Sequence, residues 1–155
     1  DPVKSWIAQR VMKLPRSAAA AARVDLPGAS AGEVLGQLVT DRLLRGPATS
    51  VAQKRTAPTY LYEFAWSSPV RDLRAAHAVE IAFVFGHLGA PDSVRLSGDS
   101  APAALATEMH DAWVRFIHTG NPGWERYDDR RLTRIFDDQS RTAPQRRTTI
   151  LAALA

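Results

Sequence analysis

The 155-residue chain contains no cysteine. This absence excludes disulfide bridges, thiolate metal sites and a cysteine nucleophile within it. The chain also lacks any apolar run near the roughly 20 residues that a transmembrane helix requires, so no membrane partner is expected. It starts without an initiator methionine and without a signal-peptide pattern, which is typical of a chain cut from a longer one. These absences permit a cytoplasmic location without establishing one.

Basic charge is present but is not concentrated. The net charge is +4 and the pI is near 10, mostly from arginine. The arginines are scattered, apart from the pairs Arg130-Arg131 and Arg146-Arg147. A nucleic-acid site needs such charges on one face, together with aromatic side chains or a known motif. We therefore expect a basic, solvated surface and no nucleic-acid partner.

Hydrophobic periodicity and capping signals predict helices alternating with strands. We expect helices over residues 6–14, 17–24, 31–39, 48–55, 101–119 and 148–155, and strands over residues 59–66 and 131–136. Gly46 and Pro47 are expected to separate two of these helices. The order is that of an α/β protein, and two strands are too few for a complete doubly wound sheet. The chain is therefore predicted to form the closing part of such a sheet.

The first candidate for chemistry is His77. It follows the aromatic strand at residues 59–66 and precedes an apolar run that ends at Gly86. A histidine side chain can accept and return a proton near neutral pH. Position alone does not distinguish this role from that of a structural or surface histidine.

The residues around His77 carry more information. Residues 74–86 read RAAHAVEIAFVFG, which resembles the catalytic-histidine segment of the carboxylesterase type B family, His-x-x-Glu-[Ile/Leu]-x-[Phe/Tyr]-Val-Phe-Gly. Segments that resemble the family in the same order lie at residues 40–47, 58–66, 113–122 and 124–127. The resemblance covers residues 1–138 and implies the C-terminal part of an α/β-hydrolase fold, with an incomplete sheet. It also implies that His77 is the general base and acid of a serine esterase.

Glu80 is the single acid in the apolar run after His77. The resemblance implies that Glu80 supports the wall of the active site and is not the triad acid, which the family takes from an earlier loop. A buried acid bound to the backbone or to a basic side chain is an equally good interpretation. Together, His77 and Glu80 are too few for a metal site, and His87, His110 and His118 have no spacing that adds a third ligand.

Ser30 lies in the sequence Gly-Ala-Ser-Ala-Gly, which matches the nucleophile motif Gly-x-Ser-x-Gly. The motif requires a buried strand before it, but residues 23–27 are short, charged and end in proline. Glu33 follows Ser30 at the spacing of a helix capping box. We therefore interpret Ser30 as a helix N-cap and consider the nucleophile the weaker alternative.

These interpretations converge on one partial domain, residues 1–155, without an internal boundary. The resemblance implies a parent protein that hydrolyses small-molecule carboxylic esters without a cofactor, with the nucleophile and acid supplied by sequence outside this chain. The chain alone is then expected to be inactive, and the missing N-terminal part of the same fold is its expected partner. The alternative is a non-catalytic or degenerate carboxylesterase-like fold that acts in binding, or a truncated gene product.

Overall fold

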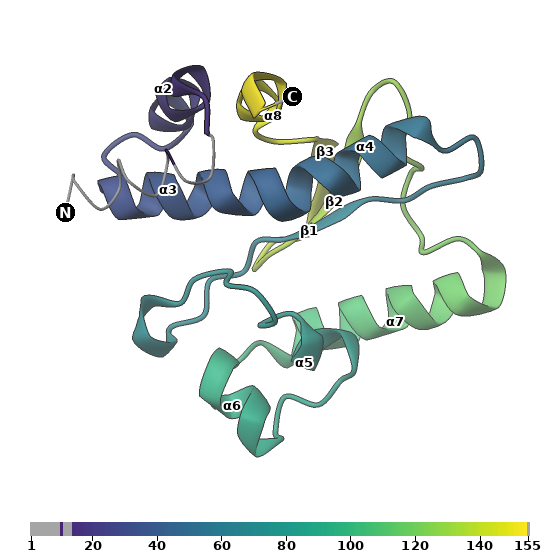
Figure 1. The fold of residues 1–155 in the computed structure, drawn as a ribbon. Coiled ribbons are helices and arrows are strands. Elements are labelled where there is room, and N and C mark those ends of the chain that lie inside the picture. Colours follow the sequence, from purple (N-terminus) through teal and green to yellow (C-terminus); the bar gives the residue numbers. More distant parts are fainter. Residues whose placement is uncertain (1–9, 11–13, 155) are drawn as a thin grey trace. The chain divides into compact units, whose positions relative to one another are not determined.

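The structure is a computed structural model that describes residue 10 and residues 14–154 (Figure 1). The described chain falls into two compact units, residues 1–57 with 145–155, and residues 58–144. Each unit is treated by itself. The helix predicted over residues 6–14 lies outside the described residues, except at its positions 10 and 14. Whether the chain is one partial domain stays a prediction.

The first unit is helical. It contains α2 (Arg16–Asp25), α3 (Ala31–Thr40), the π-helix η1 (Asp41–Arg45), α4 (Gly46–Lys54) and α8 (Thr148–Leu154). Helix α2 packs against both α3 and α8. Its alanines at 18, 19 and 22 are buried, and small side chains on this face let the helices approach closely. The rest of this core comprises Leu14, Val34, Leu38, Ile150 and Leu154.

The predicted interruption at Gly46 and Pro47 is wrong. Helices α3 and α4 are continuous through η1, as one long helix in Figure 1. A proline inside an α-helix removes one backbone hydrogen bond and its ring meets the carbonyl four residues earlier. The wider π-turn directly before Pro47 changes this spacing, so the helix continues. The sequence pattern gave no sign of this local change in pitch.

The second unit contains a three-stranded sheet of β1 (Tyr62–Phe64), β2 (Leu132–Phe136) and β3 (Arg141–Pro144) in the order β1-β2-β3. Strands β1 and β2 are parallel, with Glu63 opposite Ile135, and β2 and β3 are antiparallel. Between β1 and β2 the chain forms η2 (Val70–Asp72), α5 (Ile81–Val84), α6 (Pro91–Ser97) and α7 (Ala103–Thr119). The parallel pair with its helical crossover confirms the predicted α/β order.

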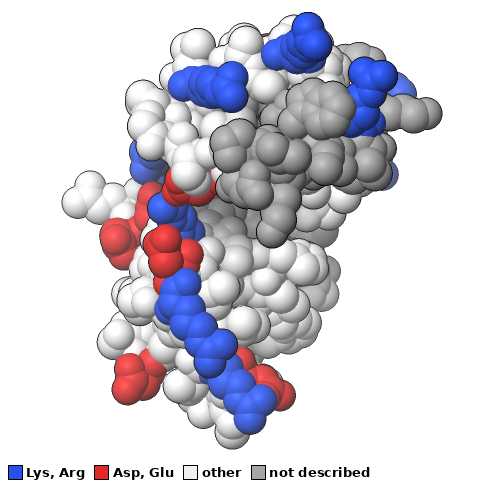
Figure 2. Space-filling model, turned by 60° about the vertical axis from the view of Figure 1, so that its left-hand side comes forward, with Lys and Arg blue, Asp and Glu red and all other residues white. Residues whose placement is uncertain are grey.

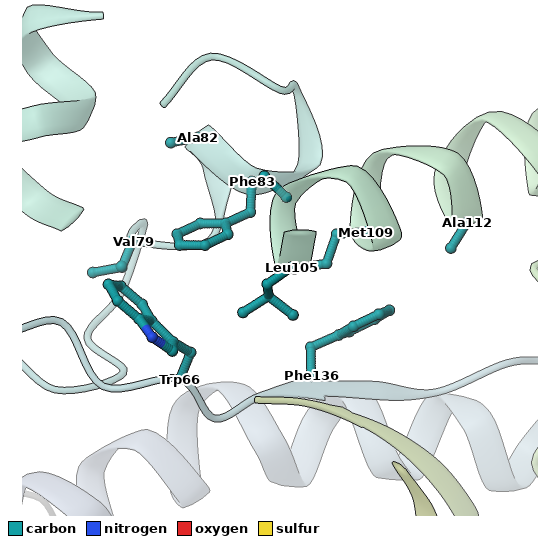
Figure 3. Close-up of a cluster of buried hydrophobic side chains, with 9 residues drawn as sticks. Trp66, Val79, Ala82, Phe83, Leu105, Met109, Ala112 and Phe136 are labelled. Carbon is teal, nitrogen blue, oxygen red and sulfur yellow. The ribbon is translucent and has the colours of Figure 1, made fainter. Parts of the chain in front are cut away.

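Helices α5 and α7 pack together over one face of this sheet. Figure 3 shows the core that results, with Phe83 of α5, Leu105 and Met109 of α7 and Phe136 of β2 pointing toward one another. Trp66, just after β1, completes the group. The centroid of its ring lies 5.2 Å from that of Phe83. This core fixes the chain on both sides of the segment that carries His77.

Several predicted boundaries differ from the structure. The strand expected over residues 59–66 pairs regularly only at Tyr62–Phe64, although Thr59, Leu61 and Ala65 still make backbone hydrogen bonds around it. Strand β3 and helix α6 were not predicted, because their own segments are short and mostly polar. Helix α7 has Pro102 at its N-cap position and no side-chain cap, and it begins at Ala103, two residues after the predicted start at residue 101.

The apolar stripe predicted on α7 is only partly buried. Leu105 and Met109 are buried, whereas Trp113, Phe116 and Ile117 are 39%, 43% and 73% exposed. The C-terminal half of the helix therefore presents apolar side chains that no described part of the second unit covers fully. Gly120 ends the helix as expected, with a left-handed backbone at φ 72°.

Candidate active site

The segment that leads from β1 to His77 is held in an irregular conformation. Ser68 and Arg74 form an isolated antiparallel bridge, and the Ser68 hydroxyl donates to the carbonyl of Leu96 at 2.6 Å. Arg71, Asp72 and Arg74 have positive φ angles of 49°, 56° and 55°. Non-glycine residues adopt this left-handed region at a cost, and such positions concentrate at functional sites.

His77 lies in the turn between this loop and α5 and is exposed. The next residue, Ala78, also has a positive φ of 73°. Val79 and Phe83, which follow His77 closely in the chain, are buried in the core shown in Figure 3 and anchor the turn. Among the described residues, no hydrogen bond or ion pair reaches the His77 ring. The turn is thus fixed while its imidazole is open to solvent.

Glu80 occupies the N-cap position of α5, where its carbonyl oxygen accepts from the amides of Phe83 and Val84, each at 3.0 Å. Its side chain is half-buried. Burial, and then the negative charge of Glu80, raise the pKa of the Tyr62 phenol in β1 above its ordinary value. Whether Glu80 supports His77 stays a prediction.

The contact between Tyr62 and Trp113 was not singled out from the sequence. Their rings meet edge to face, with centroids 6.3 Å apart, and the Trp113 indole donates a hydrogen bond to the Tyr62 phenol. The two-residue period of the aromatic strand does place Tyr62 and Phe64 on the same face. That period identifies the face of β1 but not the helix above it.

The other histidines of the second unit do not form a site with His77. The Nδ1 atom of His110 lies 3.0 Å from the carbonyl oxygen of Val84, which links α7 to α5. Within the described residues, no group of three or more histidine, aspartate and glutamate side chains could hold a metal ion. His110 and His118 are exposed on α7.

Ser30 belongs to the first unit and is the N-cap of α3. Its hydroxyl accepts from the amide of Glu33 at 3.3 Å, and the Glu33 carboxylate accepts from the amide of Ser30 at 2.7 Å. The predicted capping box is therefore confirmed. That Ser30 is not a nucleophile remains a prediction.

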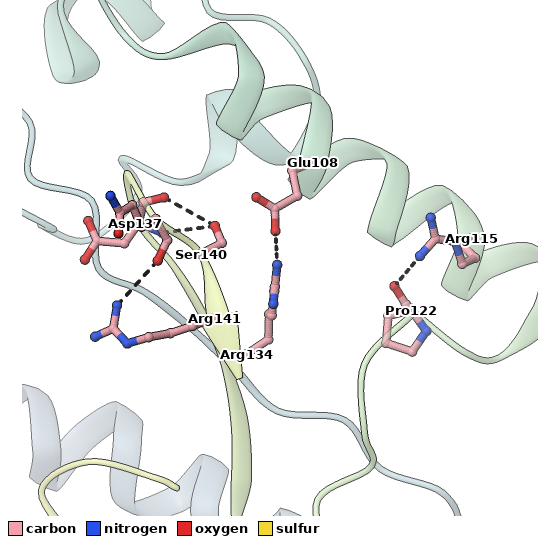
Figure 4. Close-up of polar contacts among 8 residues, drawn as sticks. Glu108, Arg115, Pro122, Arg134, Asp137, Ser140 and Arg141 are labelled. Carbon is pink, nitrogen blue, oxygen red and sulfur yellow. Dashed lines mark hydrogen bonds and ion pairs between the residues drawn. The ribbon is translucent and has the colours of Figure 1, made fainter. Parts of the chain in front are cut away.

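Charged side chains of opposite sign stand next to one another on the face drawn in Figure 2. In the second unit, Asp128 pairs with Arg130 and Glu108 with Arg134, and Figure 4 shows the latter pair joining α7 to β2. The expected absence of a nucleic-acid partner is not tested by this arrangement. No helix among the described residues is long and apolar enough to cross a membrane.

Solved structures place this architecture in a known class. The chain superposes on the carboxylesterase EST55 of Geobacillus stearothermophilus with a TM-score of 0.78 and 27% identity, over 92% of this chain and 32% of that one. A thermophilic para-nitrobenzyl esterase gives a TM-score of 0.71 and 26% identity, over 100% of this chain and 33% of that one. The chain forms part of an α/β-hydrolase fold.

Sequence comparison defines the family. Residues 23–145 match the model of the carboxylesterase family, and the chain belongs to that family. It is 33% identical to phenmedipham hydrolase of Pseudarthrobacter oxydans over 130 residues, which are 79% of this chain and 26% of that protein. It is 33% identical to para-nitrobenzyl esterase of Bacillus subtilis over 113 residues, or 66% and 23% of the two. The chain thus spans about a quarter of the length of these curated relatives.

Proposed function

We propose that this chain supplies the catalytic histidine, His77, to a serine carboxylic-ester hydrolase. The observation that carries the proposal is the family-specific segment at residues 74–86, whose histidine is solvent-exposed on a turn that buried side chains anchor. An imidazole in this setting is free to take the proton from a serine hydroxyl and to return it to the departing alcohol. The relatives named for phenmedipham and para-nitrobenzyl esters support an ester or a similar small acyl compound as substrate.

The serine and the acid of the triad are proposed to come from the part of the carboxylesterase fold that this chain does not span. The chain alone is therefore expected to be inactive, and its partner is the remaining part of the same fold. Strand β1 supports this expectation, because it pairs with β2 on one side and with no described strand on the other. A further parallel strand could pair along that edge of the sheet.

Glu80 is proposed as a positioning residue that acts through the turn bearing His77. Its carbonyl oxygen accepts the first backbone hydrogen bonds of α5, and its negative charge acts on Tyr62 of the sheet. This role predicts a smaller loss of activity for Glu80→Gln than for His77→Ala, because the base itself is retained. No cofactor is included in the proposal.

The test uses a chimera in which this chain replaces the matching segment of the Bacillus subtilis para-nitrobenzyl esterase, assayed on p-nitrophenyl butyrate. We expect His77→Ala to lower kcat by about a thousandfold or more, since each triad member contributes on this scale. His87→Ala, at an exposed histidine of the following loop, is the matched control and should leave kcat unchanged. Equal activity of His77→Ala and the unsubstituted chimera would refute the proposal.

A further inference from the structure

One side-chain hydrogen bond closes the segment of the second unit that carries His77. The hydroxyl of Ser68, four residues after β1, donates to the carbonyl oxygen of Leu96 in α6 at 2.6 Å. The two residues are 28 positions apart in the chain, and His77 lies between them. The bond therefore joins the chain before His77 to the chain after it.

The other polar groups of Ser68 act on the loop itself. Its backbone amide donates to the carbonyl of Arg74 at 3.1 Å, and its hydroxyl accepts from the amide of Val70, also at 3.1 Å. The hydroxyl is thus a donor to α6 and an acceptor for the loop at once. Because Ser68 is only 3% exposed, solvent cannot readily replace these bonds when the hydroxyl is removed.

The loop needs this support because its backbone is strained. The left-handed residues Arg71, Asp72 and Arg74 lie between the two ends that Ser68 holds, the Val70 amide and the Arg74 carbonyl. Non-glycine residues keep such a conformation only where their surroundings over-determine it. Ser68 therefore sets the direction in which the chain leaves Arg74 for His77, three residues further on.

Helix α6 supplies the fixed side of the closing bond. Leu96 lies in its last turn, where backbone carbonyls have no partner within the helix, so the Ser68 hydroxyl occupies an acceptor that the helix leaves open. The next two residues of the loop also lie against this end of α6. A Cβ atom on Gly98 would be 3.5 Å from Cγ2 of Val70 and 3.7 Å from Cγ of Pro69.

The position of the His77 ring depends on its backbone. Among the described residues, no hydrogen bond or ion pair reaches the imidazole, so nothing in that part of the chain holds the ring directly. The buried side chains of Val79 and Phe83 hold the turn on its C-terminal side. Ser68 is the corresponding support on the N-terminal side.

We propose that Ser68 is a positioning residue for His77: its bond to Leu96 closes the segment between β1 and α6 and so fixes where the imidazole stands. This inference rests on the proposed role of His77 as the base. Ser68 itself takes no part in proton transfer. Its loss should therefore slow the reaction through a displaced base and leave substrate binding nearly unchanged.

The chimera with the para-nitrobenzyl esterase tests this role with two matched substitutions. Ser68→Ala should lower kcat by about ten- to hundredfold and leave KM within about twofold, since a displacement of roughly 1 Å costs rate on this scale. Ser97→Ala is the control, because Ser97 is 0% exposed and its hydroxyl donates to the Ser93 carbonyl within α6 at 2.8 Å. It also loses a buried hydrogen bond, but it should leave kcat unchanged. Thermal unfolding shows that each variant is folded at the assay temperature.

A conservative variant separates positioning from stability alone. Ser68→Cys keeps the size of the side chain and a weaker donor, so its kcat should lie between those of Ser68→Ala and the unsubstituted chimera. It also provides the measurement if Ser68→Ala does not fold. A kcat reduced at least about threefold at unchanged KM then supports the role, and an unchanged kcat overturns it.

His77→Ala in the same chimera distinguishes the two levels of the argument. An unchanged kcat in Ser68→Ala, or equal losses in Ser68→Ala and Ser97→Ala, beside an inactive His77→Ala would refute the positioning role alone. Full activity of His77→Ala would refute the proposed function, and the role of Ser68 would fall with it.

Discussion

The backbone amide of Gly46 donates to the carbonyl oxygen of Asp41, five residues earlier. This bond defines the π-turn that lets α3 continue into α4 despite Pro47. A Cβ atom on residue 46 would lie 2.9 Å from the same Asp41 oxygen. Real Cβ atoms essentially never approach backbone oxygen so closely, and the backbone cannot turn away as a long side chain would. Glycine at position 46 is therefore required by space, since its φ of −59° is open to any residue.

This relationship predicts opposite effects for two glycine-to-alanine substitutions in one helix. Gly46→Ala should lower the free energy of unfolding by about 1–3 kcal/mol, because the added methyl group forces a backbone shift. Gly36→Ala, in the middle of α3 with open space around its Cβ position, should raise it by about 0.5–1 kcal/mol. Urea denaturation of both variants measures the difference. Equal effects of the two would contradict the π-turn.

The capping box at Ser30 provides a second prediction. Ser30→Ala removes the acceptor for the Glu33 amide and should destabilise the first unit by about 0.5–2 kcal/mol. Ser30→Asp restores an acceptor and should recover most of that loss. In the chimera that carries the esterase nucleophile, Ser30→Ala should leave kcat unchanged. A loss of hydrolysis as complete as that of His77→Ala, without unfolding, would instead identify Ser30 as the nucleophile.

The buried carboxyl group of Asp41 predicts a pH dependence of stability. Burial raises the pKa of Asp41 above its ordinary value of 3.8, against the opposing effects of Arg45, Gln37 and Arg147. The Asp41 side chain has an exposed fraction of 0%, and its Oδ1 atom is bonded to Arg45 at 2.9 Å. Between pH 3.8 and the raised pKa, the folded state binds more protons than the unfolded state. Stability from this group therefore falls as the pH rises through that window.

Asp41→Asn removes this titration and isolates its effect. The free energy of unfolding of the unsubstituted chain, minus that of Asp41→Asn, should decrease as the pH rises from 3.8 through the raised pKa, and then level off. Denaturation of both proteins over a pH series in one buffer system gives this difference directly. A difference that increases with pH would mean that the ion pair with Arg45 outweighs burial.

The sequence allowed most of the longer helices, the strands that became β1 and β2, and the family to be predicted, because each rests on local pattern. The capping box of Ser30 and the stop at Gly120 depend on side chains within a few residues of one another. The π-turn before Pro47 could not be predicted in this way. It depends on a backbone hydrogen bond from Gly46 to the carbonyl five residues earlier, where an α-helix uses the carbonyl four residues earlier. Strand β3 gave no apolar alternation because only its backbone pairs with β2, and its side chains are exposed or half-buried.

The candidate site was predictable to a similar extent. His77 and Glu80 follow from the segment around them, but the contact between Tyr62 and Trp113 depends on how α7 lies over β1. Trp113 is 51 residues beyond Tyr62 in the numbering, and no local pattern joins them. Contacts of this kind are set by packing between elements and therefore require the structure.

The charge effect of Glu80 on Tyr62 can be measured directly. Burial and the negative charge of Glu80 raise the pKa of Tyr62 above 10.0, while the hydrogen bond from Trp113 opposes them. Glu80→Gln removes the charge but leaves the burial, so the pKa of Tyr62 should fall while remaining above 10.0. Because the folded-state pKa is raised, stability from Tyr62 is lost as the pH rises above 10.0, and Glu80→Gln should reduce this alkaline loss.

Carbon-13 labelling of the tyrosine ring carbons follows this titration, and Tyr62→Phe assigns its signal among the three tyrosines. Asp92→Asn, on exposed α6, is the matched removal of one negative charge and should leave the Tyr62 titration unchanged. If both charge removals shift Tyr62 equally, the effect comes from overall charge and not from Glu80. If Glu80→Gln shifts Tyr62 alone, the carboxylate three residues after His77 is held against the sheet, as its proposed positioning role requires.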